Sequence, residues 1–219
     1  MFNLIIKDIL IQKKTLVFML IYIIVFMFAL QSLGSGAFSG IIIAVTYQLV
    51  TTACNQEEKV NSDIILNSMP IRRRDIVLAK YLSIFVYTIA ATLCYYVITI
   101  ILSFTGMQTT FYAITLKNLA GAICATIVMN SLYFPFYFKW GFVKAKIVSF
   151  ILFFLFFFGI ISLLNVIEDA QEMAWLQSIS NLFTGRTDIQ TFFILIGLAF
   201  ILLLGSYGLS VKFYNSREF

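Results

Sequence analysis

Six long apolar stretches separated by short polar segments dominate the hydrophobic pattern of the chain. They cover residues 15–30, 37–54, 81–103, 116–138, 147–165 and 191–211. Each is close to the length of about 20 residues that an α-helix needs to cross the hydrocarbon core of a bilayer. The apolar positions run on without alternating, which favours helices over the strands of a membrane barrel. The pattern predicts an all-α integral membrane protein with six transmembrane helices in one domain, residues 1–219.

The composition agrees with lipid as the solvent for most side chains. Hydrophobic residues make up 61% of the chain and charged residues 11%, whereas soluble domains carry about 25% charged residues. The first stretch could also be a signal peptide, because basic residues precede it and residues 35–37 resemble a cleavage site. The number of spans and the placement of charge favour a retained helix.

The basic residues indicate which side of the membrane each segment occupies. With the N-terminus in the cytosol, all of the 15 basic residues except Lys117 and Arg186 lie on inner segments. Cytosolic loops are enriched in Lys and Arg. The sequence therefore predicts that both termini are cytosolic and that residues 166–190 form an extracellular loop. The net charge of +5 is explained by this sidedness, so we expect membrane lipid and no nucleic acid as a partner.

Two segments outside the spans have an amphipathic character. Residues 1–14 could form an interfacial helix with Phe2, Ile5, Ile6 and Ile9 on one face, or a plain cytosolic extension of the first span. In the outer loop, Trp175 favours a short helix at the membrane interface, and a re-entrant segment is the alternative.

Several kinds of chemistry are missing from the sequence. The chain has no histidine, and its three cysteines show no metal-binding spacing. No charged residue lies in the spans away from their ends, which disfavours an ion-coupled carrier. No phosphate-binding loop and no serine-hydrolase or metalloprotease motif is present. We therefore predict no catalytic, cofactor or metal site, and we expect another polypeptide to supply any energy for transport.

Uncharged polar residues follow one helical face in each of two spans. They are Gln48, Thr51 and Thr52 in the second span and Thr88, Thr92, Tyr95 and Thr99 in the third. Such side chains can bond packed helices to each other. They could equally form a mildly polar path for a substrate, and both interpretations stay open.

The longest inner connection, residues 55–80, is the most informative segment. Residues 57–67 could form a short amphipathic helix, Pro70 interrupts it, and Arg72 begins a helix that runs into the third span. Three consecutive arginines near a helix N-terminus oppose its dipole, so helix stability does not explain them. They could fix the topology and bind anionic headgroups, or they could bind a cytosolic partner.

Residues 66–82, LNSMPIRRRDIVLAKYL, resemble the LPxSRxxIVxxKYL signature of the type-2 ABC transporter permease family. The matches are Pro70, Arg73, Ile76, Val77, Lys80 and Tyr81. Met69 stands where leucine is common, and Arg72 stands where serine or threonine is common. The closest similarity is to small bacterial exporters of phenol-soluble modulins and antimicrobial peptides.

The resemblance implies a permease in the bacterial plasma membrane that pairs with a second permease, identical or different. It implies a coupling helix between spans two and three that binds a cytosolic ABC ATPase, which holds ATP and Mg²⁺. The docking residues would be Glu57, Glu58, Asp63, Met69, Pro70, Arg72, Arg73, Arg74 and Asp75.

On this basis the expected function is ATP-driven export of an amphipathic peptide or hydrophobic compound. A non-transporting immunity protein or sensor scaffold that binds a peptide or a partner protein is the alternative. A membrane-embedded enzyme acting on lipid is a third possibility, for which the sequence offers no catalytic groups.

Overall fold

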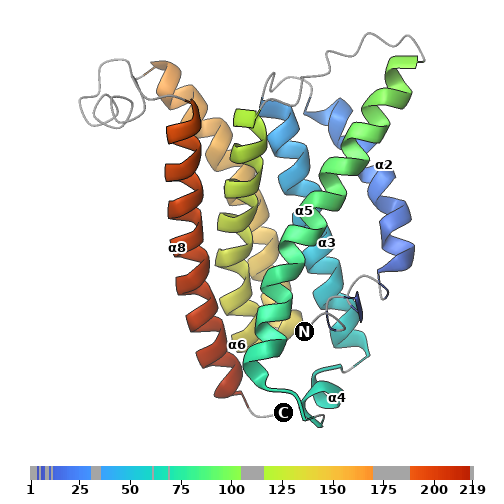
Figure 1. Cartoon of the computed structure of the whole chain (residues 1–219), viewed down its shortest axis with the longest axis vertical. Coiled ribbons are helices and arrows are strands. Elements are labelled where there is room, and N and C mark those ends of the chain that lie inside the picture. Colours follow the sequence, from blue (N-terminus) through green and yellow to red (C-terminus); the bar gives the residue numbers. More distant parts are fainter. Residues whose placement is uncertain are drawn as a thin grey trace.

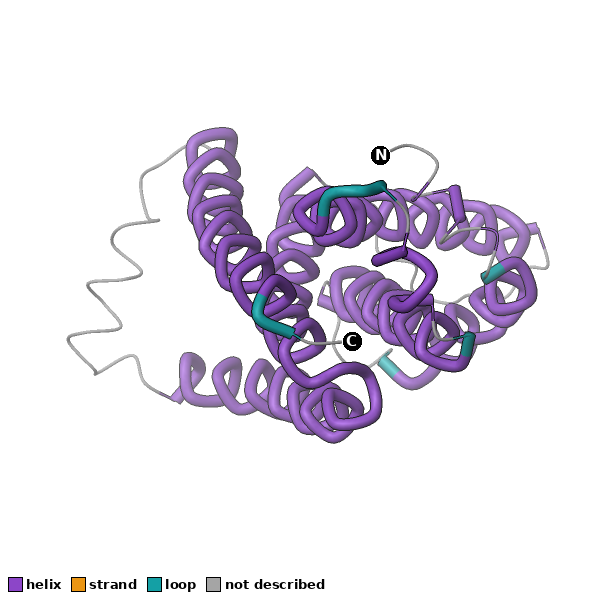
Figure 2. Tube along the Cα trace, turned by 90° about the horizontal axis from the view of Figure 1, so that it is seen from below, coloured by secondary structure: helices purple, strands orange, loops and turns teal. Residues whose placement is uncertain are grey.

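A computed structural model shows the chain as a bundle of α-helices (Figures 1 and 2). It describes residues 4, 6, 7, 10, 12–30, 36–60, 62–68, 70–104, 116–169 and 188–217. The helices are α2 (Lys13–Ala29), α3 (Ala37–Lys59), α4 (Ser62–Ser68), α5 (Arg73–Phe104), α6 (Leu116–Asp169) and α8 (Asp188–Asn215). No strand occurs within these residues, which confirms the prediction of an all-α membrane protein.

Four helical segments of the described chain are long and apolar enough to cross a membrane. They are Ala37–Lys59, Arg73–Phe104, Asn118–Gly159 and Phe193–Asn215, and the apolar segment Val17–Ala29 of α2 is shorter. Large apolar side chains such as Phe104 and Ile201 lie on the outside of the bundle. The chain is thus a multi-pass membrane protein, while the count of six spans and their sidedness stay predictions.

Two of the predicted stretches, 116–138 and 147–165, belong to the single helix α6. Gly141 interrupts it with φ 75° and ψ 172°, a conformation that essentially only glycine adopts. A straight helix of 54 residues would be about 80 Å long, but α6 turns at its lower end and returns (Figure 1). Residues 116–140 form its first arm and residues 142–169 its second arm.

Helix α3 lies at the centre of the bundle. In its spanning segment 72% of the residues are buried, more than twice the share in any other spanning segment. It packs against α2, α5 and α6, while α8 packs on α6 and α5. The Tyr47 ring of α3 lies 5.8 Å from the Tyr133 ring on the first arm of α6 and 6.2 Å from the Phe153 ring on the second.

The connection between α3 and α5 differs in part from the prediction. The expected helix over 57–67 is wrong, because α3 continues through Lys59 and a separate helix, α4, covers Ser62–Ser68. The interruption at Pro70 is confirmed, and α5 begins at Arg73. Half of residues 1–14, with Phe2, Ile5 and Ile9, lie outside the described residues, and so do loop residues 170–187 with Trp175.

Candidate functional site

Two buried charged side chains and one partly exposed one form an ion cluster at the end of the bundle that carries α4, which we call the loop end. The Oε1 atom of Glu57 lies 2.5 Å from the Nζ of Lys7, and the Oε2 atom of Glu57 lies 2.7 Å from the Nζ of Lys80. The side chains of Glu57 and Lys80 are each only 6% exposed. Tyr137 of the first arm of α6 donates its hydroxyl to Glu57 Oε2 at 3.4 Å.

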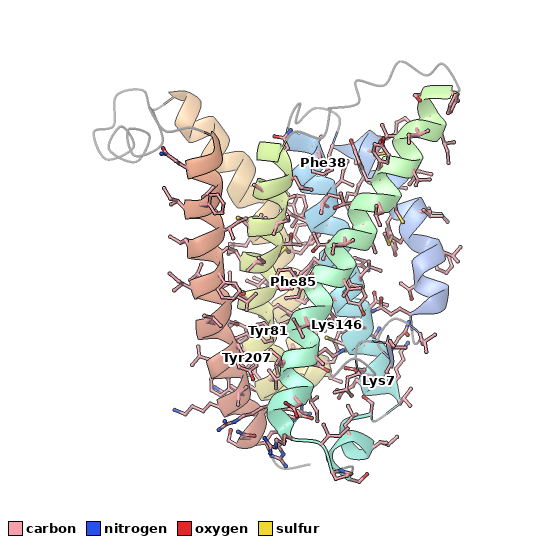
Figure 3. All side chains as sticks on the ribbon, in the orientation of Figure 1. Lys7, Phe38, Tyr81, Phe85, Lys146 and Tyr207 are labelled. Carbon is pink, nitrogen blue, oxygen red and sulfur yellow. The ribbon has the colours of Figure 1, made fainter. Side chains whose placement is uncertain are left out.

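Pairing explains why a carboxylate can occupy this buried position. A buried ion costs several kcal/mol unless partners compensate it, and a negative charge in the last turns of α3 also opposes the helix dipole. Lys7 and Lys80 supply that compensation from two other parts of the chain (Figure 3 labels Lys7). The ion cluster therefore joins the N-terminal segment, α3 and α5, with α6 attached through Tyr137.

The next residue, Glu58, ties α3 to the break in α6. The backbone N–H of Phe142 donates to a Glu58 carboxylate oxygen at 3.4 Å, and Phe142 directly follows Gly141. Glu57 and Glu58 were both predicted to dock a partner protein. In the structure the Glu57 carboxylate is paired within the chain and the Glu58 carboxylate accepts a backbone hydrogen bond, both near the end of α3, and their role in docking stays a prediction.

The three arginines of the loop occupy different environments. Arg73 is half-buried, and its Nη1 donates to the carbonyl oxygens of Tyr214 at 3.3 Å, Asn215 at 3.0 Å and Arg217 at 3.4 Å. These contacts satisfy carbonyl groups that the end of α8 leaves without helical partners. Arg72 and Arg74, by contrast, are exposed.

The remaining predicted docking residues fall in or next to the loop. Pro70 is exposed, and Asp75 is half-buried in the first turn of α5, where its N–H donates to the Arg72 carbonyl at 2.9 Å. Asp63 belongs to α4, but its side chain lies outside the described set, and Met69 lies outside it entirely.

The polar residues of α3 line a crevice. Gln48, Thr51 and Thr52 face it together with Asn55, and Tyr47 donates a hydrogen bond across it to the Ser149 Oγ at 2.9 Å. The second arm of α6 supplies the opposite wall. That wall is mainly aromatic and aliphatic, with the Lys146 ammonium as its charged group (Figure 3), and the crevice holds about 720 Å³.

The polar residues of α5 do not line this crevice. The hydroxyls of Thr88, Thr92 and Thr99 each donate at 2.8 Å to the carbonyl four residues earlier in the same helix. The ring of Tyr95 packs edge-on against Phe38 of α3, at 5.1 Å between centroids. The structure therefore separates the two predicted stripes, and that of α5 serves its own helix and the α3–α5 contact.

Sequence reasoning assigned no role to Lys7, Lys80 or Tyr137. Lys80 is a signature residue and the last residue of the predicted loop, so a signal was present, but its partner is 23 positions earlier in the chain. Tyr81 was missed in the same way, and its hydroxyl lies 2.6 Å from the Ser206 Oγ and 2.8 Å from the Ser210 Oγ of α8.

The described residues contain no group of three His, Cys, Asp or Glu side chains that could hold a metal ion. The arrangement offers instead the ion cluster, two exposed arginines at the start of α5 and a crevice with one polar and one apolar wall. These features can bind partners and transmit movement between a loop and membrane helices.

Together, the fold and these contacts define a multi-pass helical membrane protein with a structured loop at one end. A family model described as ABC-2 family transporter protein matches residues 3–215. The chain therefore belongs to this family, as the 66–82 segment indicated, and is a permease subunit of an ABC transporter. Neither the comparison with curated proteins nor that with solved structures returns a match.

Proposed function

We propose that the chain is the membrane-spanning subunit of an ATP-driven exporter. In this proposal six spans place both termini and the loop end in the cytosol, and a separate ABC ATPase holds ATP and Mg²⁺. A second permease completes the translocation unit. The cargo is an amphipathic peptide or a hydrophobic compound that partitions into the membrane.

The ion cluster is the observation that carries this proposal. Glu57 is followed within three residues by the turn into α4, and Lys80 lies two turns inside α5. A buried ion pair is strongly destabilised when one partner is withdrawn. A movement of the connection between Glu57 and Lys80 therefore moves α3 and α5 together, because the ion pair prevents the connection from bending independently of the two helices.

Arg72, Arg74 and Pro70 form the surface that such a movement requires. All three are exposed at or just before the start of α5, whereas Arg73 is engaged with the end of α8. Guanidinium groups make bidentate contacts with carboxylates, which gives geometric specificity. We therefore restrict the arginine part of the ATPase contact to Arg72 and Arg74, and assign Arg73 to the fold.

The crevice between α3 and the second arm of α6 is the proposed start of the translocation path. Amide and hydroxyl groups of Gln48, Thr52 and Asn55 face an apolar wall that includes Phe150 and Phe154. A site with both characters suits a cargo with polar and apolar faces. Thr88, Thr92, Tyr95 and Thr99 are not part of this path.

Co-purification tests the proposal. The tagged full chain is expressed together with the genes that flank its own, and any ABC ATPase that co-purifies is measured for wild type, Arg72→Glu/Arg74→Glu and Lys144→Glu/Lys212→Glu. Lys144 and Lys212 are exposed, so the second double variant matches the change in charge. We expect the arginine variant to lose at least tenfold in bound ATPase and the lysine variant to keep it.

Equal retention by both variants would show that the arginines do not dock the ATPase. If the wild-type chain binds no ATPase and confers resistance to a peptide without nucleotide hydrolysis, the immunity or sensor scaffold is the correct function.

A further inference from the structure

A second groove lies on the outside of the bundle, between the first arm of α6 and α8. Its volume is about 580 Å³, and Leu132, Pro135, Gly205 and Leu209 are among its apolar lining residues. This is within the range of about 300–1,000 Å³ that is usual for ligand sites. Leu132 and Leu209 are 50% and 52% exposed, so the groove opens to the surroundings of the bundle.

One end of the groove carries a positive charge held against aromatic rings. Lys139 Nζ lies 5.3 Å from the centroid of the Trp140 ring and 5.2 Å from that of Phe213. All three residues line the groove. Lys139 and Trp140 are the residue types that lie at a membrane interface, where a long basic side chain reaches the headgroups.

This charged end is the loop end of the bundle. Tyr207 of α8 donates to the Arg74 carbonyl at 3.5 Å, and Arg73 contacts the end of α8 beyond Phe213. In the proposed topology Lys139 therefore faces the inner leaflet. Basic pockets between membrane helices on the cytosolic side bind anionic lipid headgroups.

A buried hydroxyl deeper in the groove gives an independent indication of a ligand. Ser131 is 5% exposed, lines the groove, and its Oγ has no hydrogen-bond partner among the described residues. A buried hydroxyl without a partner is costly. It lies about two helical turns from Lys139, where an ester group of a lipid could accept its hydrogen bond.

We propose that this groove is a binding site for an anionic phospholipid of the inner leaflet. Lys139 pairs with the phosphate, Ser131 donates to an ester carbonyl, and one acyl chain lies along Leu132, Pro135, Gly205 and Leu209. The charge at one end and the apolar length beside it together select a lipid over a soluble anion.

Trp140 provides a direct probe of the site. The chain has two tryptophans, so in a Trp175→Phe background the emission reports on Trp140 alone. The purified full chain is titrated in detergent with phosphatidylglycerol or phosphatidylcholine brominated in the acyl chains. We expect phosphatidylglycerol to quench at about fivefold lower concentration, the effect of one lysine at a charged surface.

Substitutions then separate charge, shape and hydrogen bonding. Lys139→Gln should abolish the preference for phosphatidylglycerol, while Lys139→Arg and the matched Lys144→Gln should keep it. A Cβ added at Gly205 meets nothing within 4 Å, so Gly205→Leu can fill the groove and should weaken quenching by both lipids. Ser131→Ala should weaken binding of diester but not of diether phosphatidylglycerol.

Two results would overturn the proposal. Equal loss of preference in Lys139→Gln and Lys144→Gln would mean general attraction to a basic surface. The other result combines two measurements: neither lipid quenches Trp140, and the Leu209→Cys variant forms a disulfide between two chains. That result would show that a second copy of the chain covers the groove.

Discussion

At the residue scale, charged side chains with similar positions in the sequence serve different purposes. Glu57 and Lys80 close a buried ion pair, Arg73 binds the last carbonyls of α8, and Arg72 and Arg74 remain at the surface. Burial and partners, and not residue type, separate a structural role from a docking role. Single substitutions therefore have different expected effects along this short segment.

Replacing Glu57 should destabilise the fold strongly. Glu57→Ala removes the carboxylate that lies next to the buried Lys80 ammonium, so we expect the free energy of unfolding to fall by about 3–5 kcal/mol. The double variant Glu57→Ala/Lys80→Met removes both charges and should recover a large part of the lost unfolding free energy. Thermal unfolding of the purified chain measures the effect, with the exposed Lys59→Gln as control. A double variant no better than Glu57→Ala would contradict this explanation.

Replacing Arg73 should loosen the end of α8 only. Arg73→Ala removes three hydrogen bonds to carbonyl oxygens, worth about 1 kcal/mol at a half-exposed site. Hydrogen exchange of the backbone amides in 211–217 should become about fivefold faster. Arg72→Ala, its exposed neighbour, should leave exchange unchanged, and the same acceleration in both variants would contradict the assignment.

At the element scale, the turn of α6 at Gly141 creates the main architecture of the bundle. One residue with positive φ lets a continuous helical sequence form two arms that both contact Tyr47. The same turn brings Phe142 to Glu58 and the second arm to the crevice. The packing of both α6 arms on α3 therefore depends on the turn at this residue.

Substitution of Gly141 should therefore be costly. Its conformation disfavours any side chain, and a Cβ there would lie 2.8 Å from the Arg217 Nη2. Gly141→Ala should lower stability by about 1–3 kcal/mol. Gly159→Ala on the same helix meets nothing within 4 Å and should be neutral or stabilising. Thermal unfolding of the two variants compares them, and equal stability would contradict the strained turn.

At the scale of the whole molecule, basic residues from distant parts of the chain gather at the loop end. Lys7, Lys80 and the three arginines all lie at the loop end, where α8 also finishes. An excess of Lys and Arg marks the cytosolic side of membrane proteins. The proposed orientation thus rests on the fold as well as on the sequence.

Cysteine labelling in intact cells tests this orientation. In a chain with Cys54, Cys94 and Cys124 replaced by alanine, Arg74→Cys should react with a membrane-impermeant maleimide only after the cells are opened. Gln177→Cys in the predicted outer loop should react in intact cells. The reverse pattern would place the loop end outside and exclude ATPase docking there.

How much the sequence predicted can be judged from particular elements. The apolar stretches gave α2, α3, α5 and α8 to within a few residues at most ends, because length and hydropathy are local properties. The helix over 57–67 was wrong, because burial of Glu57 extends α3 beyond the apolar run. The α3 polar stripe lines a crevice and the similar α5 stripe does not, although threonines of both stripes bond to carbonyls of their own helix.

By itself the sequence determined that this is a helical membrane protein of the ABC-2 transporter family, since both follow from contiguous residues. The tertiary structure decided which polar residues work together. Glu57 meets Lys7 across 50 positions and Arg73 meets Asn215 across 142. Such contacts depend on how the helices pack, and no local pattern encodes that packing.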